Sequence, residues 1–335
     1  MDDKTKKYCD SLVDIWKKLQ KVFRRDNDKI VLAGSTVFVC AGVEPDIAKI
    51  QMCEDFVKNN TEKNSPLRSM FRIPFVCKMS LQDKPGIYFD KVKHICELLG
   101  TYKWLTDDSK MASAMIIADC SDGDAHDDAS LRYYLNETDK VLNELKERFG
   151  KKLSEKDYPY AAMLAASDYE IEPLVDDVMG CYERLAPTFK DGGVCKGLSY
   201  ILALGVDDPA AKKNKLIELF GGIEQSEMRF GRGQELIITA PLSLLETPAN
   251  LLAEDFLETE VYMKMDKHCR GYTMKPNIRN LYTALMIFEA HRNDFESLED
   301  FAFSDIVSIM IQLEAAVITP SSSSILSFGG AKISN

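Results

Sequence analysis

The chain has 335 residues, 45% of them hydrophobic and 28% charged, and its formal net charge is −11. A chain of this length and hydrophobic content can fold around a sizeable core, and its composition excludes disorder over most of its length. The acidic balance argues against a broad surface for nucleic acids or anionic membranes, because both require a basic face.

The chain opens with a pattern typical of an amphipathic helix over residues 4–25. Leu12, Ile15, Leu19 and Phe23 recur at helical spacing and predict one apolar face. We interpret residues 1–28 as a helix that caps the N-terminal end of a longer helical array.

Runs of small and apolar residues then recur along the chain, each roughly ten residues long. A helix that is apolar all round is a buried helix, so we expect these runs to form an inner layer. β-Branched residues in 31–39 and 235–239 leave buried strands as an alternative there. The runs begin at Val31, Phe71, Met111, Tyr160, Gly197, Glu235 and Asn280.

Prolines mark the starts of a second kind of helix, at intervals of about 40 residues or twice that. Proline is favoured in the first turn of a helix, and Asp208 and Thr247, which precede two of these prolines, suit a helix cap. The stretches that follow are amphipathic, which predicts outer helices with one face in water. The prolines are Pro45, Pro85, Pro173, Pro209 and Pro248.

Together these patterns predict an all-α fold of about seven tandem α-hairpin repeats. Each predicted hairpin is an inner helix, a short acidic turn and the outer helix that follows it. The array can be an open α/α superhelix or a closed α/α toroid, and the sequence does not choose between them. We expect residues 29–319 to form a single repeat domain and residues 320–335 a flexible serine- and glycine-rich tail.

Several segments carry a resemblance to a known family. They are DYPYAAMLAASD at residues 157–168, YERL at 182–185, GLSYILALG at 197–205 and RFGRGQEL at 229–236. In their order and spacing the chain resembles domain-of-unknown-function family 4003, over about residues 10–318. The resemblance implies a bacterial, all-helical protein with no assigned activity, and it supplies no catalytic residues.

Polar residues at the starts of the predicted inner helices are the main candidates for a ligand site. If the hairpins stack in register, these residues gather at one end of the inner layer, where free backbone N–H groups favour anionic or hydroxylated ligands. Helix caps and solvated turns are the alternative interpretation. The candidates are Arg72, Asp157, Lys196, Gln234, Glu235 and Arg279.

Two weaker candidates involve carboxylates. Asp157 and Glu235 could serve as an acid–base pair, by analogy with other α/α toroids. Asp119, Asp122 and Asp124 lie close together in one acidic turn and could supply oxygen ligands to a cation, although the full EF-hand pattern is absent. Acidic residues in turns also cap helices, which is the simpler explanation.

The cysteines and the two ends of the chain indicate the cellular location of the protein. Nine cysteines are scattered singly with no C-x-x-C pair, which fits a reducing cytoplasm and supports neither disulfides nor a zinc site. The polar N-terminus predicts no secretory signal, and residues 306–318 are too short and polar to span a membrane. That segment could instead join copies into a homo-oligomer. We expect no cofactor.

Two hypotheses on function remain from the sequence. The first is a non-enzymatic helical-repeat binding protein for a peptide, a protein or a small anionic ligand. The alternative is a toroidal enzyme, a carbohydrate-type hydrolase or lyase, which would need a closed ring with Asp157 and Glu235 within about 10 Å of each other.

Overall fold

The computed structural model describes residues 1–121, 128–167, 169–224, 234–271 and 274–291, without the side chains of residues 128, 234 and 235. Over these residues the chain forms fourteen α-helices and no strand. The predicted all-helical fold is therefore confirmed, and the alternative of buried strands is wrong. Residues 31–39 lie inside an α-helix, and residues 235–239 form a 3₁₀-helix and the start of another α-helix.

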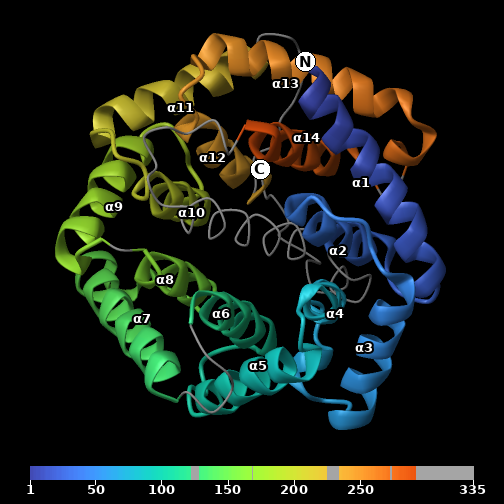
Figure 1. The fold of residues 1–335 in the computed structure, drawn as a ribbon. Coiled ribbons are helices and arrows are strands. Elements are labelled where there is room, and N and C mark those ends of the chain that lie inside the picture. The colour runs from blue at the N-terminus through green and yellow to red at the C-terminus, as the bar shows by residue number, and fades with distance from the viewer. Residues whose placement is uncertain (122–127, 168, 225–233, 272–273, 292–335) are drawn as a thin grey trace, which may run out of the picture.

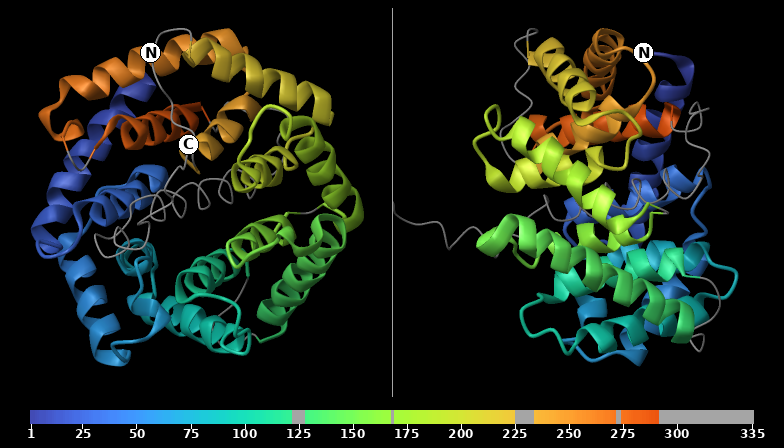
Figure 2. Two further views of the ribbon diagram at one scale, coloured as in Figure 1. Left: turned by 180° about the vertical axis from the view of Figure 1, so that it is seen from behind. Right: turned by 90° about the vertical axis from the view of Figure 1, so that its left-hand side faces the viewer.

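The helices alternate along the chain between an outer and an inner layer of a ring, as Figure 1 shows. The view from behind shows the same two layers (Figure 2, left). The outer helices are α1 (Asp3–Val22), α3 (Ile47–Asn60), α5 (Pro85–Leu99), α7 (Asp128–Phe149), α9 (Ile171–Leu185), α11 (Pro209–Glu224) and α13 (Ala249–Met265).

The apolar runs form the inner helices. In α2 every residue from Val31 to Cys40 is buried, and α14 is buried from Ile278 to Ala290. The inner helices are α2 (Asp28–Ala41), α4 (Arg72–Leu81), α6 (Asp107–Cys120), α8 (Asp157–Ala165), α10 (Gly192–Leu202), α12 (Thr239–Leu244) and α14 (Pro276–His291). Four 3₁₀-helices accompany them, namely η1 (Pro66–Arg68), η2 (Gly150–Lys152), η3 (Gln234–Ile238) and η4 (Lys267–Cys269).

The pairing of the helices differs from the prediction. Of the inner helices that it contacts, each outer helix packs most closely on the one that follows it, as α1 does on α2 and α7 on α8. The sequence had indicated pairs of an inner helix with the outer helix after it. The first helix, expected to be a separate cap, is thus the outer partner of α2.

The two ends of the described chain meet. Helix α1 packs against α14 and also contacts α13. The Tyr262 hydroxyl donates to the Asp10 carboxylate at 2.7 Å, and the ammonium of Lys6 lies 5.6 Å from the centroid of the Tyr262 ring. The first and last helices are therefore neighbours, which closes the ring seen in Figure 1.

Capping side chains set the starts of several helices. Asp208 accepts hydrogen bonds from the backbone N–H groups of Ala210 and Ala211 at 2.8 and 3.3 Å, as the sequence predicts for the start of α11. Asp191 and Thr106 do the same at the starts of α10 and α6. Each cap satisfies a donor that has no partner within its own helix.

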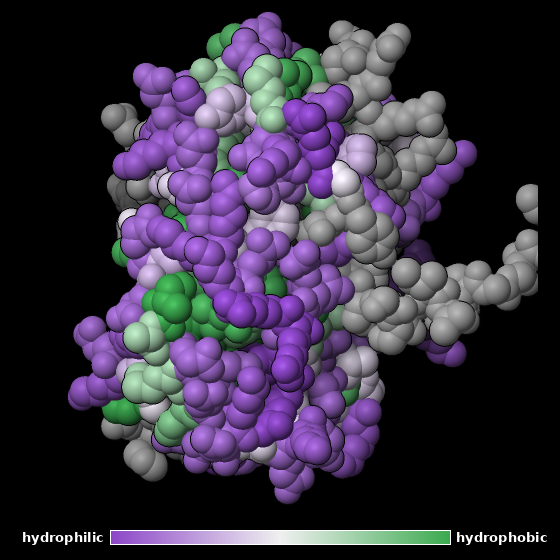
Figure 3. All heavy atoms as spheres, turned by 90° about the vertical axis from the view of Figure 1, so that its right-hand side faces the viewer, coloured by the Kyte–Doolittle hydropathy of each residue, from purple (hydrophilic) through white to green (hydrophobic). Residues whose placement is uncertain are grey.

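The outer surface over α1 and α3 is mainly hydrophilic, with hydrophobic areas scattered between the hydrophilic side chains (Figure 3). This agrees with the expectation that outer helices keep one face in water. Among the described residues, no helix combines the length and the apolar character that crossing a bilayer requires.

The nine cysteines are all free, and eight of them are buried. Burial raises the pKa of the Cys9, Cys96, Cys181 and Cys269 thiols to about 12. The thiolate is the reactive form, so these thiols are protected both by their low ionisation and by their lack of access.

We expect Ellman's reagent to titrate no more than one thiol in the native protein at pH 8, because only Cys120 is half-buried. In guanidinium chloride all nine should react. A Cys120→Ser variant should react with none while folded. Rapid modification of several thiols in the native state would contradict this burial.

Candidate functional site

Asp157, the central candidate from the sequence, is the acceptor of a closed hydrogen-bond cluster. Its carboxylate is almost fully buried and receives the Lys196 ammonium at 2.8 Å and the Tyr200 hydroxyl at 2.8 Å. The backbone N–H and the hydroxyl of Ser154 add bonds of 2.6 and 3.1 Å. Lys196 also donates to the carbonyl of Lys152 at 2.8 Å. The first residue of α8 is thus tied to α10.

The two candidate arginines are also held in ion pairs. Arg72 pairs with Glu54 of α3 and with Asp26. Arg279 donates from Nε to Glu260 of α13 at 2.6 Å and from Nη1 to the Cys269 carbonyl at 3.2 Å. In both cases the start of an inner helix is joined to the outer helix that precedes it.

The remaining candidates are only partly described. The side chains of Gln234 and Glu235 lie outside the described residues, so the proposed pairing of Asp157 with Glu235 stays a prediction. Asp119 pairs with Lys78 and accepts from the Tyr88 hydroxyl at 3.0 Å, and burial raises its pKa.

The predicted cation site in the acidic turn is untested. Asp122 and Asp124 lie outside the described residues. Within the described part of the chain, no three histidine, cysteine or acidic side chains are arranged to hold a metal ion.

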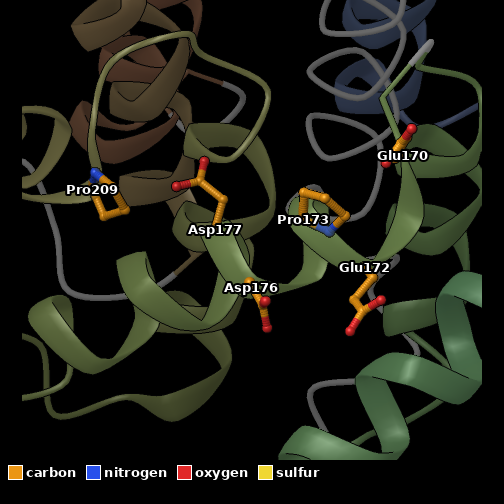
Figure 4. Close-up of a pocket in the computed structure, with 6 residues that line it drawn as sticks. All are labelled: Glu170, Glu172, Pro173, Asp176, Asp177 and Pro209. Atoms are coloured by element: carbon orange, nitrogen blue, oxygen red, sulfur yellow. The ribbon is translucent and has the colours of Figure 1, made fainter.

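The structure reveals an open groove of about 570 Å³ between the start of α9 and the start of α11. Its lining is acidic, and Figure 4 shows Glu172 and Asp176 on one side of α9 and Asp177 projecting toward Pro209. The volume falls within the range of ordinary ligand pockets, about 300–1,000 Å³. The lining residues are Glu170, Glu172, Pro173, Asp176, Asp177 and Pro209.

The carboxylates of the groove differ in how they are neutralised. Asp177 pairs with the buried ammonium of Lys212, which also donates to the Gly205 carbonyl at 2.8 Å. Burial raises the pKa of Asp177, and Lys212 opposes that rise. Asp176, about half-exposed, meets Arg148 at 2.8 Å. Glu170 and Glu172 are exposed and form no ion pair within the described part of the chain.

The groove lies away from the Asp157 cluster. Apart from Pro209, its lining comes from residues 170–177, whereas Tyr182, near the other end of α9, packs edge-on against Phe149 at 4.9 Å. Phe149 in turn contacts Tyr200, the partner of Asp157. The sequence singled out Pro173 as a helix marker but did not propose the carboxylates around it as ligand contacts, although four of them within residues 170–177 are a visible signal.

Comparison with known proteins places the chain in a family. It matches the family described as protein of unknown function (DUF4003) over residues 15–316, so the chain belongs to that family. The resemblance expected from the sequence is therefore confirmed. No curated protein and no solved structure was found to match the chain.

Proposed function

We propose that this protein is a non-enzymatic binding protein, built as a ring of tandem helical hairpins (an α/α toroid), whose groove between α9 and α11 receives a positively charged segment of a peptide or protein partner. The observation that carries this proposal is that Glu170 and Glu172 are exposed at the groove and form no ion pair with any residue that the structure describes. The charged ligand candidates whose side chains the structure describes are instead held in internal ion pairs, namely Arg72, Asp157, Lys196 and Arg279.

A cationic partner suits the groove better than an anionic one. Four carboxylates line the groove, and the ion pairs with Lys212 and Arg148 neutralise two of them, Asp177 and Asp176, while Glu170 and Glu172 keep their negative charges. The cations proposed from the sequence, Arg72, Lys196 and Arg279, each already face a carboxylate. An anionic ligand at those positions would have to displace the carboxylate that is already paired there, and breaking such a buried ion pair costs several kcal/mol.

The paired-carboxylate enzyme has less support. A general acid or base must reach the proton that it transfers. Both oxygens of Asp157 already accept hydrogen bonds from Lys196, Tyr200 and Ser154 in a buried cluster. We therefore prefer a binding role. We also propose a cytoplasmic location, which the nine free thiols favour.

The test is a titration with fluorescein-labelled pentalysine, followed by anisotropy at low ionic strength. The variant Glu170→Gln/Glu172→Gln removes two groove charges, and each is worth about 0.5–1 kcal/mol at an exposed site. We expect binding to weaken by roughly 5- to 30-fold.

The control variant Glu62→Gln/Glu97→Gln changes the net charge equally at exposed sites outside the groove lining and should bind like the wild type. Equal losses in both variants would reduce the binding to general attraction by the net charge of −11. Tighter binding of labelled pentaglutamate than of pentalysine would also refute the proposal that the groove binds a positively charged segment.

A further inference from the structure

Two neighbouring surfaces of opposite charge meet where α7 ends beside α9. Glu172, Asp176 and Glu183 are exposed and recur at spacings of four and seven residues, which places them on one face of α9. The end of α7 and the following η2 carry Arg148, Lys151 and Lys152, all exposed. We call the first set the acidic stripe and the second the basic end.

The boundary between the two is fixed by one contact. Arg148 of the basic end meets Asp176 of the acidic stripe at 2.8 Å, and these side chains are 40% and 57% exposed. The ammonium of Lys152 lies 6.0 Å from the centroid of the Tyr182 ring of α9. Lys151, Lys152, Glu172 and Glu183 make no ion pair within the described part of the chain. Opposite unpaired charges therefore flank one neutral pair.

Such a surface is complementary to itself. A twofold axis through the boundary would lay the basic end of each copy over the acidic stripe of the other, so both halves of the contact match at once. We propose that the protein forms a twofold-symmetric homodimer through the acidic stripe and the basic end. The partner is thus a second copy of this chain, recognised by charge complementarity.

The inference goes beyond the proposed function but shares Glu172 with the groove. Exposed charge pairs contribute little individually, so the dimer is expected to be weak and sensitive to salt. At 0.1 M salt the Debye length of about 10 Å screens the repulsion between two acidic chains while close contacts persist.

The test is sedimentation velocity of the full chain, whose mass is 37.8 kDa, over a concentration series. We expect the mass to double with rising concentration in 0.1 M salt and to return to the monomer value in 1 M salt. The variants Lys151→Glu/Lys152→Glu and Glu172→Lys/Glu183→Lys should each stay monomeric alone. An equimolar mixture of the two should recover the dimer, because every contact again joins opposite charges.

The control Lys63→Glu/Lys84→Glu changes the net charge as the first variant does, but at exposed positions far along the chain from α7, and should still dimerise. A wild-type monomer at all concentrations, dimers in both single-patch variants, or species that grow beyond a dimer would each overturn the proposal. Pentalysine binding that persists in a monomeric wild type would leave the groove standing while this dimer fails.

Discussion

Replacing Asp157 with alanine is expected to lower the free energy of unfolding by about 3–5 kcal/mol, the usual cost of removing one partner of a buried ion pair. Without the carboxylate, the Tyr200 hydroxyl loses its acceptor, and the Lys196 ammonium keeps only its hydrogen bond to the Lys152 carbonyl. Lys196 and Tyr200 are both buried, so water cannot replace the lost hydrogen bonds. Urea unfolding followed by circular dichroism measures the change.

A double-mutant cycle separates the pair from its surroundings. Asp157→Leu/Lys196→Met removes both charges together and should be more stable than Asp157→Leu alone, because the uncompensated ammonium is gone. Asp157→Asn should lose less than Asp157→Ala, since an amide oxygen still accepts from Tyr200. A carboxylate kept for catalysis at the expense of stability behaves differently, and its replacement is often neutral or stabilising. A loss below about 1 kcal/mol in Asp157→Ala would favour that alternative.

The positions of these helices could be predicted because the sequence patterns that mark them are local. The run from Val31 to Cys40 is small and apolar at every position, and the structure buries all of it in α2. Pro209 and Asp208 mark the start of α11 by a proline and a cap, which act within one turn. Neither signal depends on distant parts of the chain.

The partners of these helices could not be predicted in the same way. Whether α14 returns to meet α1 depends on small rotations that add up from one helix to the next, and no single segment of the sequence carries that information. The sequence also paired each inner helix with the outer helix after it, whereas in the structure each inner helix packs on the outer helix before it.

Part of the candidate site was also visible in the sequence. Arg72, Asp157, Lys196 and Arg279 stood out as polar residues at the starts of apolar helices. Their partners Glu54 and Glu260 did not, because a glutamate in the middle of an amphipathic helix resembles any exposed residue. Both are buried in the structure. The groove was missed because Pro209 and the start of α9 come together only in the folded chain.

Lys212→Met should lower the free energy of unfolding and at the same time tighten the binding of pentalysine in the groove. Lys212 is almost fully buried and holds Asp177 and the Gly205 carbonyl, so its loss leaves two acceptors without their donor. Asp177 keeps about a quarter of its surface in water, which softens the penalty to about 1–3 kcal/mol. The same change adds one net negative charge to the groove. We expect pentalysine to bind roughly 2- to 5-fold more tightly at pH 7.

The dependence on pH follows from the ionisation of Asp177. Burial already raises its pKa above the unfolded value of 3.8, and removing Lys212 raises the pKa further. At pH values between the unfolded and the folded pKa of Asp177, the folded chain binds more protons than the unfolded chain. The contribution of Asp177 to stability therefore falls as the pH rises from the unfolded to the folded pKa. The loss of unfolding free energy in Lys212→Met should therefore be small near pH 4 and largest at neutral pH. The gain in affinity for pentalysine should appear over the same range of pH. Urea titrations and anisotropy at matched pH values check both. A deficit that is the same at every pH would mean that lost packing of the lysine stem, rather than the charge of Asp177, accounts for it.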